Sequence, residues 1–182
     1  MNTTDTPITP IAAPHLALSD GRSVSIRAMR RTDAAAARRF LEGLSPESRR
    51  ARFLCTLTAI DDHLLQLLMA EDDKGPLAVV ATSPGDNGLD IVGVAQMAPV
   101  DTSSAECAVT VADSWQRQGL GRGLLDALAS MARERGFRRV YSVDSAGNTR
   151  MRDFARSVGA HARVDPDDPA QVIYELDLSR PA

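Results

Sequence analysis

The segment that most constrains the fold runs from Val109 to Leu125 and reads VTVADSWQRQGLGRGLL. It opens with a β-branched run typical of a strand, continues through a polar loop, and ends in an amphipathic helical pattern whose first turn carries glycines at alternate positions. Glycines let a ligand approach the backbone, and the N–H groups of a first helical turn lie unpaired at the positive end of the helix dipole. The segment therefore predicts a strand, a loop and a helix whose N-terminus binds phosphate.

Two common phosphate-binding motifs fit this segment poorly. A P-loop requires Lys followed by Ser or Thr after its last glycine, where this chain has Leu124 and Leu125. A dinucleotide-binding fingerprint would place its third glycine at Leu124, and it turns directly from strand to helix, whereas the polar residues 113–117 intervene here. Only Asp144, about 20 residues beyond the glycines, resembles the ribose-binding acid of that fingerprint. Neither motif is therefore predicted.

The remaining hydrophobic patterns predict a single domain of mixed α and β structure. At 182 residues the chain has the length of one domain. Three strand patterns between residues 77 and 112 are joined by short turns, which require antiparallel hairpins. Low hydrophobicity predicts a flexible tail at residues 1–17, followed by one domain over residues 18–182. The expected elements are a strand at 24–28; helices from Asp33 to Leu44, from Pro46 and from Asp61 or Asp62; strands at 77–82, 89–99 and 106–112; a helix at 119–135; a strand at 139–144; a helix at 149–158; and strands near Ala162 and at 172–178.

Charge and composition exclude several classes of partner. The 21 basic and 24 acidic residues give a net charge of −3, so no global field draws the chain to nucleic acid or anionic membranes. The chain has no run of about 18–20 apolar residues that would predict a membrane span. It also has no signal-peptide pattern, so a cytoplasmic location is expected. Cys55 and Cys107 are too few for a disulfide framework, and His15, His63 and His161 lack metal-ligand spacing, so no metal is expected.

The segment Gln116–Gly121, read as Gln-Arg-Gln-Gly-Leu-Gly, matches the pattern Gln/Arg-x-x-Gly-x-Gly. With the Val-Thr-Val strand before it, the Gly-Leu-Leu helix after it and Asn148 at the next helix start, it resembles the acetyl-CoA site of GNAT N-acetyltransferases. Residues 44–53 and 105–111 further resemble the GNAT domain of bacterial Pat-type protein lysine acetyltransferases. The resemblance, over residues 23–178, implies a GNAT-like α+β (mixed α/β) fold. In that fold a mostly antiparallel central sheet splays between its fourth and fifth strands, with helices on both faces.

The resemblance also implies how acetyl-CoA is bound as cosubstrate. The strand backbone would pair with the pantetheine arm like an added strand, and one of its amides would hold the thioester oxygen. The loop and first helical turn would cradle the pyrophosphate, with arginine side chains available to the ribose phosphate. Asn148 would hydrogen-bond the pantetheine arm. The implied strand residues are Val109, Thr110 and Val111, and the implied loop residues are Arg117, Gln118, Gly119, Leu120, Gly121 and Arg122.

Glu106 is the candidate catalytic base. An amine of lysine type has a pKa near 10.4 and is protonated at neutral pH, so a base must remove a proton before or during attack on the thioester. Period-two alternation places Glu106 on the same strand face as Ala108 and Thr110, and turns Cys107 to the opposite face. This placement favours direct attack in a ternary complex over acyl transfer through Cys107. The resemblance puts Glu106 where Pat-type enzymes carry their general base; a solvated or salt-bridged strand residue is the alternative.

The sequence departs from the family pattern at the general acid. Many GNAT enzymes carry a tyrosine seven residues after the asparagine, and this chain has Ala155 there. Tyr141 and Tyr174 are candidate substitutes, although core positions suit both. Solvent could also protonate a leaving thiolate whose thiol has a pKa of about 8.5. The missing tyrosine leaves the acid open without excluding transfer.

A protein lysine is the expected acceptor, with a small-molecule amine as the alternative. A non-catalytic acyl-CoA-binding sensor and an acetyltransferase acting on charged tRNA are further alternatives, and the net charge disfavours a nucleic-acid partner. The arginine clusters at residues 30–31, 38–39 and 49–52 predict either solvated ion pairs or a surface for an acidic substrate. We expect a monomer or a homodimer without a membrane partner.

Overall fold

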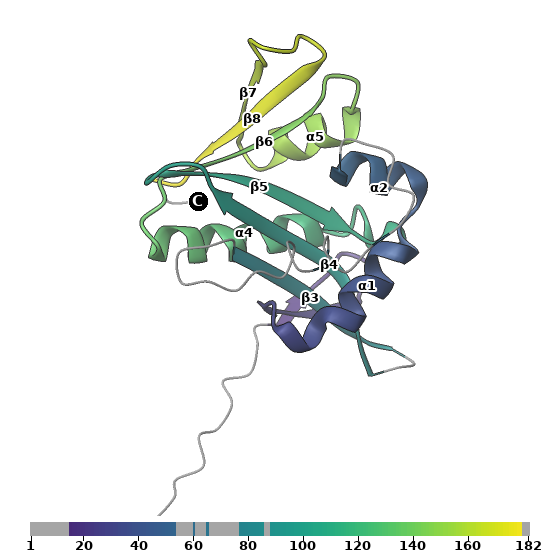
Figure 1. Cartoon of the computed structure of the whole chain (residues 1–182). Coiled ribbons are helices and arrows are strands. Elements are labelled where there is room, and N and C mark those ends of the chain that lie inside the picture. Colours follow the sequence, from purple (N-terminus) through teal and green to yellow (C-terminus); the bar gives the residue numbers. More distant parts are fainter. Residues whose placement is uncertain (1–14, 54–59, 61–64, 66–76, 86–87, 180–182) are drawn as a thin grey trace, which may run out of the picture.

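A computed structural model describes residues 15–53, 60, 65, 77–85 and 88–179, in which eight strands form one sheet (Figure 1). Neighbouring strands follow the order β1-β2-β3-β4-β5-β6-β8-β7, and each described pair is antiparallel except β5 with β6. The antiparallel hairpins predicted between residues 77 and 112 are confirmed. The strands are β1 (His15–Ala17), β2 (Ser23–Ala28), β3 (Leu77–Gly85), β4 (Gly88–Pro99), β5 (Ser104–Val111), β6 (Arg139–Ser145), β7 (His161–Val164) and β8 (Gln171–Asp177).

The described helices lie on both faces of this sheet (Figure 1). Helix α4 (Leu120–Glu134) packs on β3, β4 and β5, and α1 (Ala34–Gly43) packs on the other face of β4. Helix α2 (Pro46–Phe53) follows α1, and α5 (Thr149–Ser157) contacts β7. Each face buries its own apolar cluster because a strand places alternate residues on opposite sides. The α4 face includes Val79, Ala95, Met97, Leu120, Leu124 and Leu128, and the α1 face includes Phe40, Leu41, Val80 and Val94.

Strands β5 and β6 separate after a short stretch of parallel pairing. Their register extends only from Ser104 and Arg139 to Glu106 and Tyr141. Strand β5 nevertheless continues to Val111 and remains paired with β4 on its other side. The sheet therefore splays between the fourth and fifth of the predicted strands, which confirms this part of the fold prediction.

The predicted elements agree with the structure over most of the described chain. The expected order is confirmed for β2 to β8 and for α1, α2, α4 and α5, with element ends shifted by a few residues. The helix predicted from Asp61 or Asp62 lies outside the described residues.

The predicted tail is wrong over its last three residues. His15–Ala17 form β1, which pairs antiparallel with β2. Leu16 packs against the core on the α4 face, where Gly123 leaves room for its side chain. A three-residue strand is too short for an alternating pattern to reveal, so low hydrophobicity dominated the prediction. The rest of the predicted tail, residues 1–14, lies outside the described residues.

Gly93 on β4 is a point of close approach between α4 and the sheet. A Cβ at Gly93 would lie 2.7 Å from Leu124 Cδ1 and 3.4 Å from the Thr110 carbonyl oxygen. Leu124 is fully buried and has no space into which to withdraw. We expect Gly93→Ala to lower the free energy of unfolding by about 1–3 kcal/mol, because packed groups must move. Urea denaturation followed by circular dichroism measures this change.

Gly43→Ala is the matched control for this substitution. Gly43 ends α1 with open space where a Cβ would stand and without a left-handed φ. There we expect a gain of about 0.4–1 kcal/mol, because alanine reduces the entropy of the unfolded chain. Equal losses in the two variants would contradict the packing explanation.

Candidate active site

One edge of β5 faces the gap that opens where β6 leaves it. The Ala112 N–H donates to the Val92 carbonyl of β4 over 2.9 Å. Because backbone groups alternate in direction along a strand, those of Val109 and Val111 point the other way, into the gap. Two of the three predicted strand residues thus offer backbone groups to the gap, whereas the backbone of Thr110 points toward β4.

The loop after β5 enters α4 through two residues in the left-handed region. Arg117 has a φ of 60°, which is uncommon for a residue with a Cβ, and Gly119 caps the helix with a φ of 88°. The Gly123 N–H donates to the Gly119 carbonyl over 3.1 Å, so the N–H groups of residues 120–122 precede the helical hydrogen bonds. These donors stand at the positive end of the helix dipole, an arrangement that binds anionic phosphate.

Contacts with the turn between β1 and β2 hold this loop. The Ser19 N–H donates to the Gln118 carbonyl (3.2 Å), and the Ser19 hydroxyl donates to Gln118 Oε1 (2.6 Å). Arg22 stacks 3.8 Å from the centroid of the Trp115 ring and donates to the Ser114 carbonyl (2.8 Å). The predicted loop residue Gln118 therefore uses its side chain as an anchor. No local sequence pattern predicts these contacts, because the partners are far apart in the chain.

Asp113, in the 3-10 turn Asp113–Trp115, joins the same loop to the start of α2. Its carboxylate accepts hydrogen bonds from the Ser45 N–H (2.9 Å), the Ser45 hydroxyl (2.8 Å) and the Ser48 hydroxyl (2.7 Å). Gln116 Nε2 donates to Ser48 Oγ and to the Val111 carbonyl, each over 3.1 Å. Burial opposes ionisation of Asp113, but these hydrogen bonds outweigh it, and the pKa of the carboxyl lies below its ordinary value.

Helix α5 borders the N-terminus of α4. Arg122 Nη1 donates to the Ser157 carbonyl of α5 (2.9 Å), and its Nε lies 3.8 Å from the Asp126 carboxylate. Gly121 faces Phe154 of α5, whose ring would lie 3.4 Å from a Cβ at position 121. The predicted phosphate loop is therefore bounded by α5 on one side.

Asn148 is the N-cap of α5. Its Oδ1 accepts from the Met151 N–H (3.1 Å), and its Nδ2 donates to the Asp144 carboxylate (3.0 Å). Burial raises the pKa of Asp144, while hydrogen bonds from Asn148 and the Ser145 N–H act in the opposite direction. Capping was not among the roles expected for Asn148, although an asparagine before a helix is a recognisable N-cap signal.

The candidate general acids lie in different surroundings. Ala155 is 2% exposed, so the position of the missing tyrosine points into the interior. Tyr174 on β8 is buried, and burial followed by the charge of Asp144 raises its pKa. Tyr141 pairs in register with Glu106, and burial followed by the charge of Glu106 raises its pKa. Of these two tyrosines, Tyr141 is therefore the one beside the predicted base.

Glu106 stands where β5 and β6 part. Its side chain is exposed, and its carboxylate has no hydrogen bond or ion pair within the part of the chain that the structure describes. On β4 and β5 the neighbouring side chains on this face are small: Ala98 lies directly across on β4, and Ala108 is next on the same face of β5. We call these two residues the alanine floor.

Cys107 turns to the opposite face, as predicted from the alternation. It packs against the core beneath α4, and burial followed by the charge of Glu106 raises the pKa of its thiol to about 12. A thiol with this pKa is protonated at neutral pH and is a poor nucleophile. The Cys107 face of this strand therefore offers no reactive thiol.

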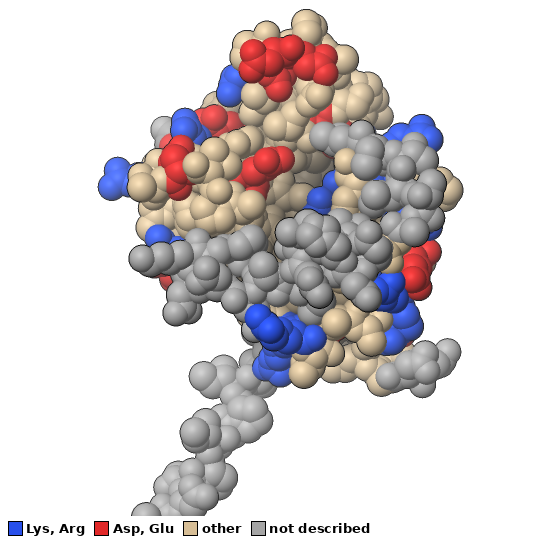
Figure 2. All heavy atoms as spheres, in the orientation of Figure 1, with Lys and Arg blue, Asp and Glu red and all other residues tan. Residues whose placement is uncertain are grey.

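The arginine clusters of α1 and α2 serve mainly local contacts. Arg39 lies 3.6 Å from the Asp90 carboxylate. Arg49 donates to the Leu44 carbonyl over 2.9 Å. On the face drawn in Figure 2, basic side chains lie over α1 and α2, and acidic ones gather over the β7–β8 hairpin. These contacts support the ion-pair interpretation of the clusters.

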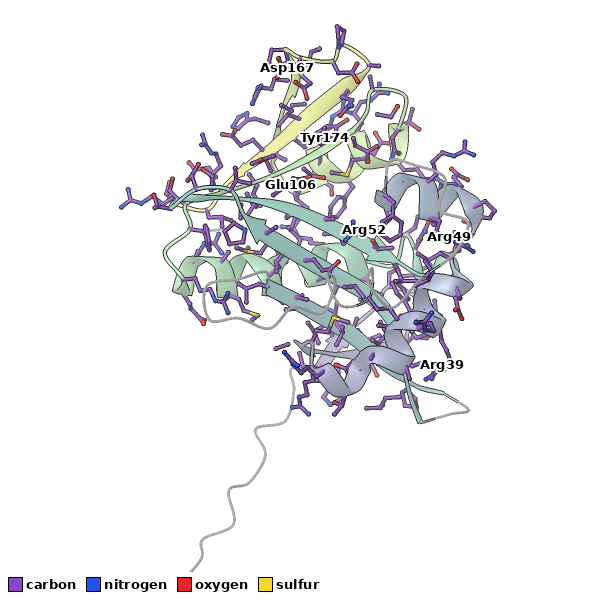
Figure 3. The ribbon with its side chains drawn as sticks, viewed as in Figure 1. Arg39, Arg49, Arg52, Glu106, Asp167 and Tyr174 are labelled. Atoms are coloured by element: carbon purple, nitrogen blue, oxygen red, sulfur yellow. The ribbon has the colours of Figure 1, made fainter. Side chains whose placement is uncertain are left out.

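Arg52 is the exception in these clusters. Its Nη2 donates to Gln96 Oε1 on β4 over 2.6 Å, and Figure 3 shows the side chain between α2 and β5. Burial lowers the pKa of Arg52, and the charge of Glu106 acts in the opposite direction. Arg52, Gln96 and Thr110 line a cavity of about 20 Å³, where the buried Thr110 hydroxyl has no partner among the described residues. The sequence of α2 has no apolar stripe that would mark one face of the helix as inward-facing, so an inward-facing Arg52 could not be predicted from it.

Comparison with known proteins decides the family. The model of the acetyltransferase (GNAT) family matches residues 35–160. The chain belongs to the GNAT acetyltransferase family. This GNAT chain is 42% identical to acetyltransferase PA5475 of Pseudomonas aeruginosa over 162 residues, which are 88% of this chain and 87% of that protein.

Solved structures share the fold of this GNAT chain. The GNAT domain of S. lividans PAT has a TM-score of 0.82 at 23% identity, over 90% of this chain and 96% of that one. The structure of yncA from Salmonella typhimurium with its cofactor acetyl-CoA has a TM-score of 0.63 at 21% identity, over 87% of this chain and 96% of that one. The GNAT-like α+β fold, the N-acetyltransferase class and acetyl-CoA as cosubstrate are confirmed.

The described residues contain no helix with the length and apolar character needed to span a membrane. They also contain no group of three or more His, Cys, Asp or Glu side chains that could hold a metal ion.

We expect Cys107 to resist thiol reagents in the folded enzyme. With a pKa of about 12, roughly one thiol in ten thousand is ionised near pH 8. In a Cys55→Ser background, where Cys107 is the remaining thiol, Ellman's reagent should react much more slowly in buffer than in urea. Cys107→Ala should also retain transfer activity. Equal reaction rates in buffer and urea would contradict the burial, and loss of transfer would point to an acyl-enzyme.

Proposed function

We propose that this GNAT enzyme moves the acetyl group of acetyl-CoA to a primary amine by direct attack in a ternary complex, with a protein lysine as acceptor. The observation that carries the proposal is the placement of Glu106, exposed at the separation of β5 and β6 and beside the alanine floor. The half-buried Cys107, packed against the core on the other face, supports a mechanism without an acyl-enzyme.

The gap between β5 and β6 would receive the pantetheine arm of acetyl-CoA. The backbone of Val109 and Val111 would pair with it, and one of these N–H groups would hold the thioester oxygen, where negative charge develops during attack. The N–H groups at the start of α4 would bind the pyrophosphate, with Arg117 and Arg122 beside it. Asn148 Nδ2 donates one hydrogen to Asp144, and its second hydrogen would serve the pantetheine arm.

Glu106 would accept the proton of the incoming amine, directly or through a water molecule. The amine nitrogen attacks the carbonyl carbon of the thioester, a C–N bond forms, and the C–S bond breaks with its electron pair leaving on sulfur. The proton passes from the amine to Glu106 and then to solvent. Because a thiol of this kind has a pKa of about 8.5, solvent can protonate the leaving thiolate. Tyr141, in register with Glu106, is the candidate protein acid.

The acidic β7–β8 hairpin would favour a cationic acceptor such as a lysine-bearing protein. Acidic side chains gather over the β7–β8 hairpin, where Figure 3 labels Asp167, and Glu106 adds a further negative charge. Opposite charges on two partners speed their encounter and orient them. A small amine would use the same chemistry without the hairpin, so comparing the two acceptor classes tests this part of the proposal.

Glu106→Gln is expected to lower kcat by about 10²–10⁴-fold, because an amide cannot take up the amine proton. Acetyl-CoA affinity should stay within about twofold, since none of the proposed donor contacts involves the Glu106 side chain. Initial rates of thiol release, measured over lysine-containing proteins and small amines, give kcat, and calorimetry gives the affinity. The assays are run in a Lys74→Arg background, which removes the single lysine of the enzyme and so prevents its acetylation from adding to the thiol signal.

Two outcomes of this experiment would count against the proposal. An unchanged rate in the Glu106→Gln variant would remove Glu106 as the base. Tight acetyl-CoA binding without acceptor-dependent thiol release in the native chain would instead favour a non-catalytic acyl-CoA-binding sensor.

Gly119→Ala tests the phosphate site. Gly119 has a φ of 88°, and an alanine in this region is strained by about 1–2 kcal/mol, which would disturb the N–H groups at the start of α4. We expect the Kd for acetyl-CoA to rise about tenfold in calorimetric titration. Gly136→Ala is the matched control, because Gly136 follows the other end of α4 with a φ of 87°. The same loss of affinity in both variants would show an effect of general destabilisation.

A further inference from the structure

Arg52 leaves the surface of α2 and reaches the sheet on the face that carries Glu106. Its anchor, Gln96 on β4, pairs in register with Ala108, and Ala98 pairs with Glu106. Residues that pair across antiparallel strands share a face, so Gln96 and Glu106 are diagonal neighbours about 7–8 Å apart. The guanidinium held by Gln96 therefore lies across the alanine floor from the Glu106 carboxylate.

The guanidinium is a half-buried cation whose described counter-charge is Glu106. Its hydrogen-bond partner Gln96 is neutral, and a cation withdrawn from water needs a compensating negative charge. The attraction of Glu106 opposes the effect of burial on Arg52. The carboxylate of Glu106, in turn, has no hydrogen bond and no ion pair in the described chain. The Arg52 guanidinium and the Glu106 carboxylate are thus opposite charges on one face of the sheet, and neither has another charged partner in the described chain.

Other described cations near this face have different partners. Arg139, beside Tyr141 on β6, donates to Ser104 Oγ (2.9 Å) and lies 3.8 Å from the Glu175 carboxylate. Arg49 on α2 donates to backbone carbonyls at the end of α1. Arg52 is therefore the described arginine whose placement suits Glu106.

We propose that Arg52 is a positioning residue for Glu106: its positive charge holds the carboxylate turned toward the alanine floor, where the acceptor amine arrives. The inference rests on the proposed role of Glu106 as the base. A carboxylate without another partner would rotate into solvent, away from the alanine floor. The guanidinium also repels a second positive charge beside it, which favours the neutral, nucleophilic form of the bound amine.

A double-mutant cycle tests this coupling. Arg52→Met, Glu106→Gln and the double variant are assayed in the full chain for acceptor-dependent thiol release, with acetyl-CoA affinity measured alongside. We expect Arg52→Met to lower kcat about tenfold when Glu106 is present. When position 106 carries glutamine, the same substitution should change kcat by less than about twofold, because its target is gone. Arg50→Met is the matched control, since Arg50 is exposed on the same helix two residues away.

The outcomes separate this inference from the proposed function. If Glu106→Gln alone leaves the rate unchanged, the proposed base is wrong and the inference falls with it. If Glu106→Gln lowers the rate but Arg52→Met lowers kcat equally in both backgrounds, the base stands and the positioning role is overturned. A rise in the acceptor KM with unchanged kcat would also overturn it and make Arg52 an acceptor-binding residue. If the methionine variant unfolds at the assay temperature, Arg52→Gln repeats the cycle with a polar, neutral side chain.

Discussion

Backbone N–H and C=O groups inside a protein need hydrogen-bond partners, and the divergence of β5 from β6 removes a neighbouring strand from one edge of β5. Pairing ends at Glu106 and Tyr141, yet β5 runs on to Val111 against β4. An extended ligand with amide groups of its own can take the place of the missing strand. The pantetheine arm of acetyl-CoA is such a ligand. The gap in the sheet is thus the binding site that we propose, and the flanking elements are arranged around it.

The loop at the mouth of the gap is held by contacts from several parts of the chain. Gly93 lets Leu124 of α4 pack closely on β4, and Ser19 anchors Gln118 from the β1–β2 turn. Asp113 ties the same loop to the first turn of α2 through two serines. Since α2 also carries Arg52, the helix that reaches toward the proposed base is hydrogen-bonded to the loop that would hold the donor. The proposed donor and acceptor surfaces would therefore share one hydrogen-bond network.

Local patterns were sufficient for the features that depend on nearby residues. Alternation along β5 placed Glu106 and Cys107 on opposite faces, and alternate glycines located the N-terminus of α4. Contacts between distant segments had no such signal, as with Arg52 and Gln96, which are 44 positions apart. The short strand β1 was missed for a related reason, since its order comes from pairing with β2 and from the packing of Leu16 rather than from its own composition.

An arginine suits position 52 better than a lysine would. The chain has 21 basic residues, of which Lys74 is the single lysine. A lysine at position 52 would be withdrawn from water, and burial lowers the pKa of a lysine. Any neutral fraction of such an amine near the thioester would compete with the acceptor as a nucleophile. A guanidinium keeps its charge when half-buried and is not a nucleophile at neutral pH. At this position the arginine can direct the carboxylate of Glu106 without becoming the substrate of the enzyme that contains it.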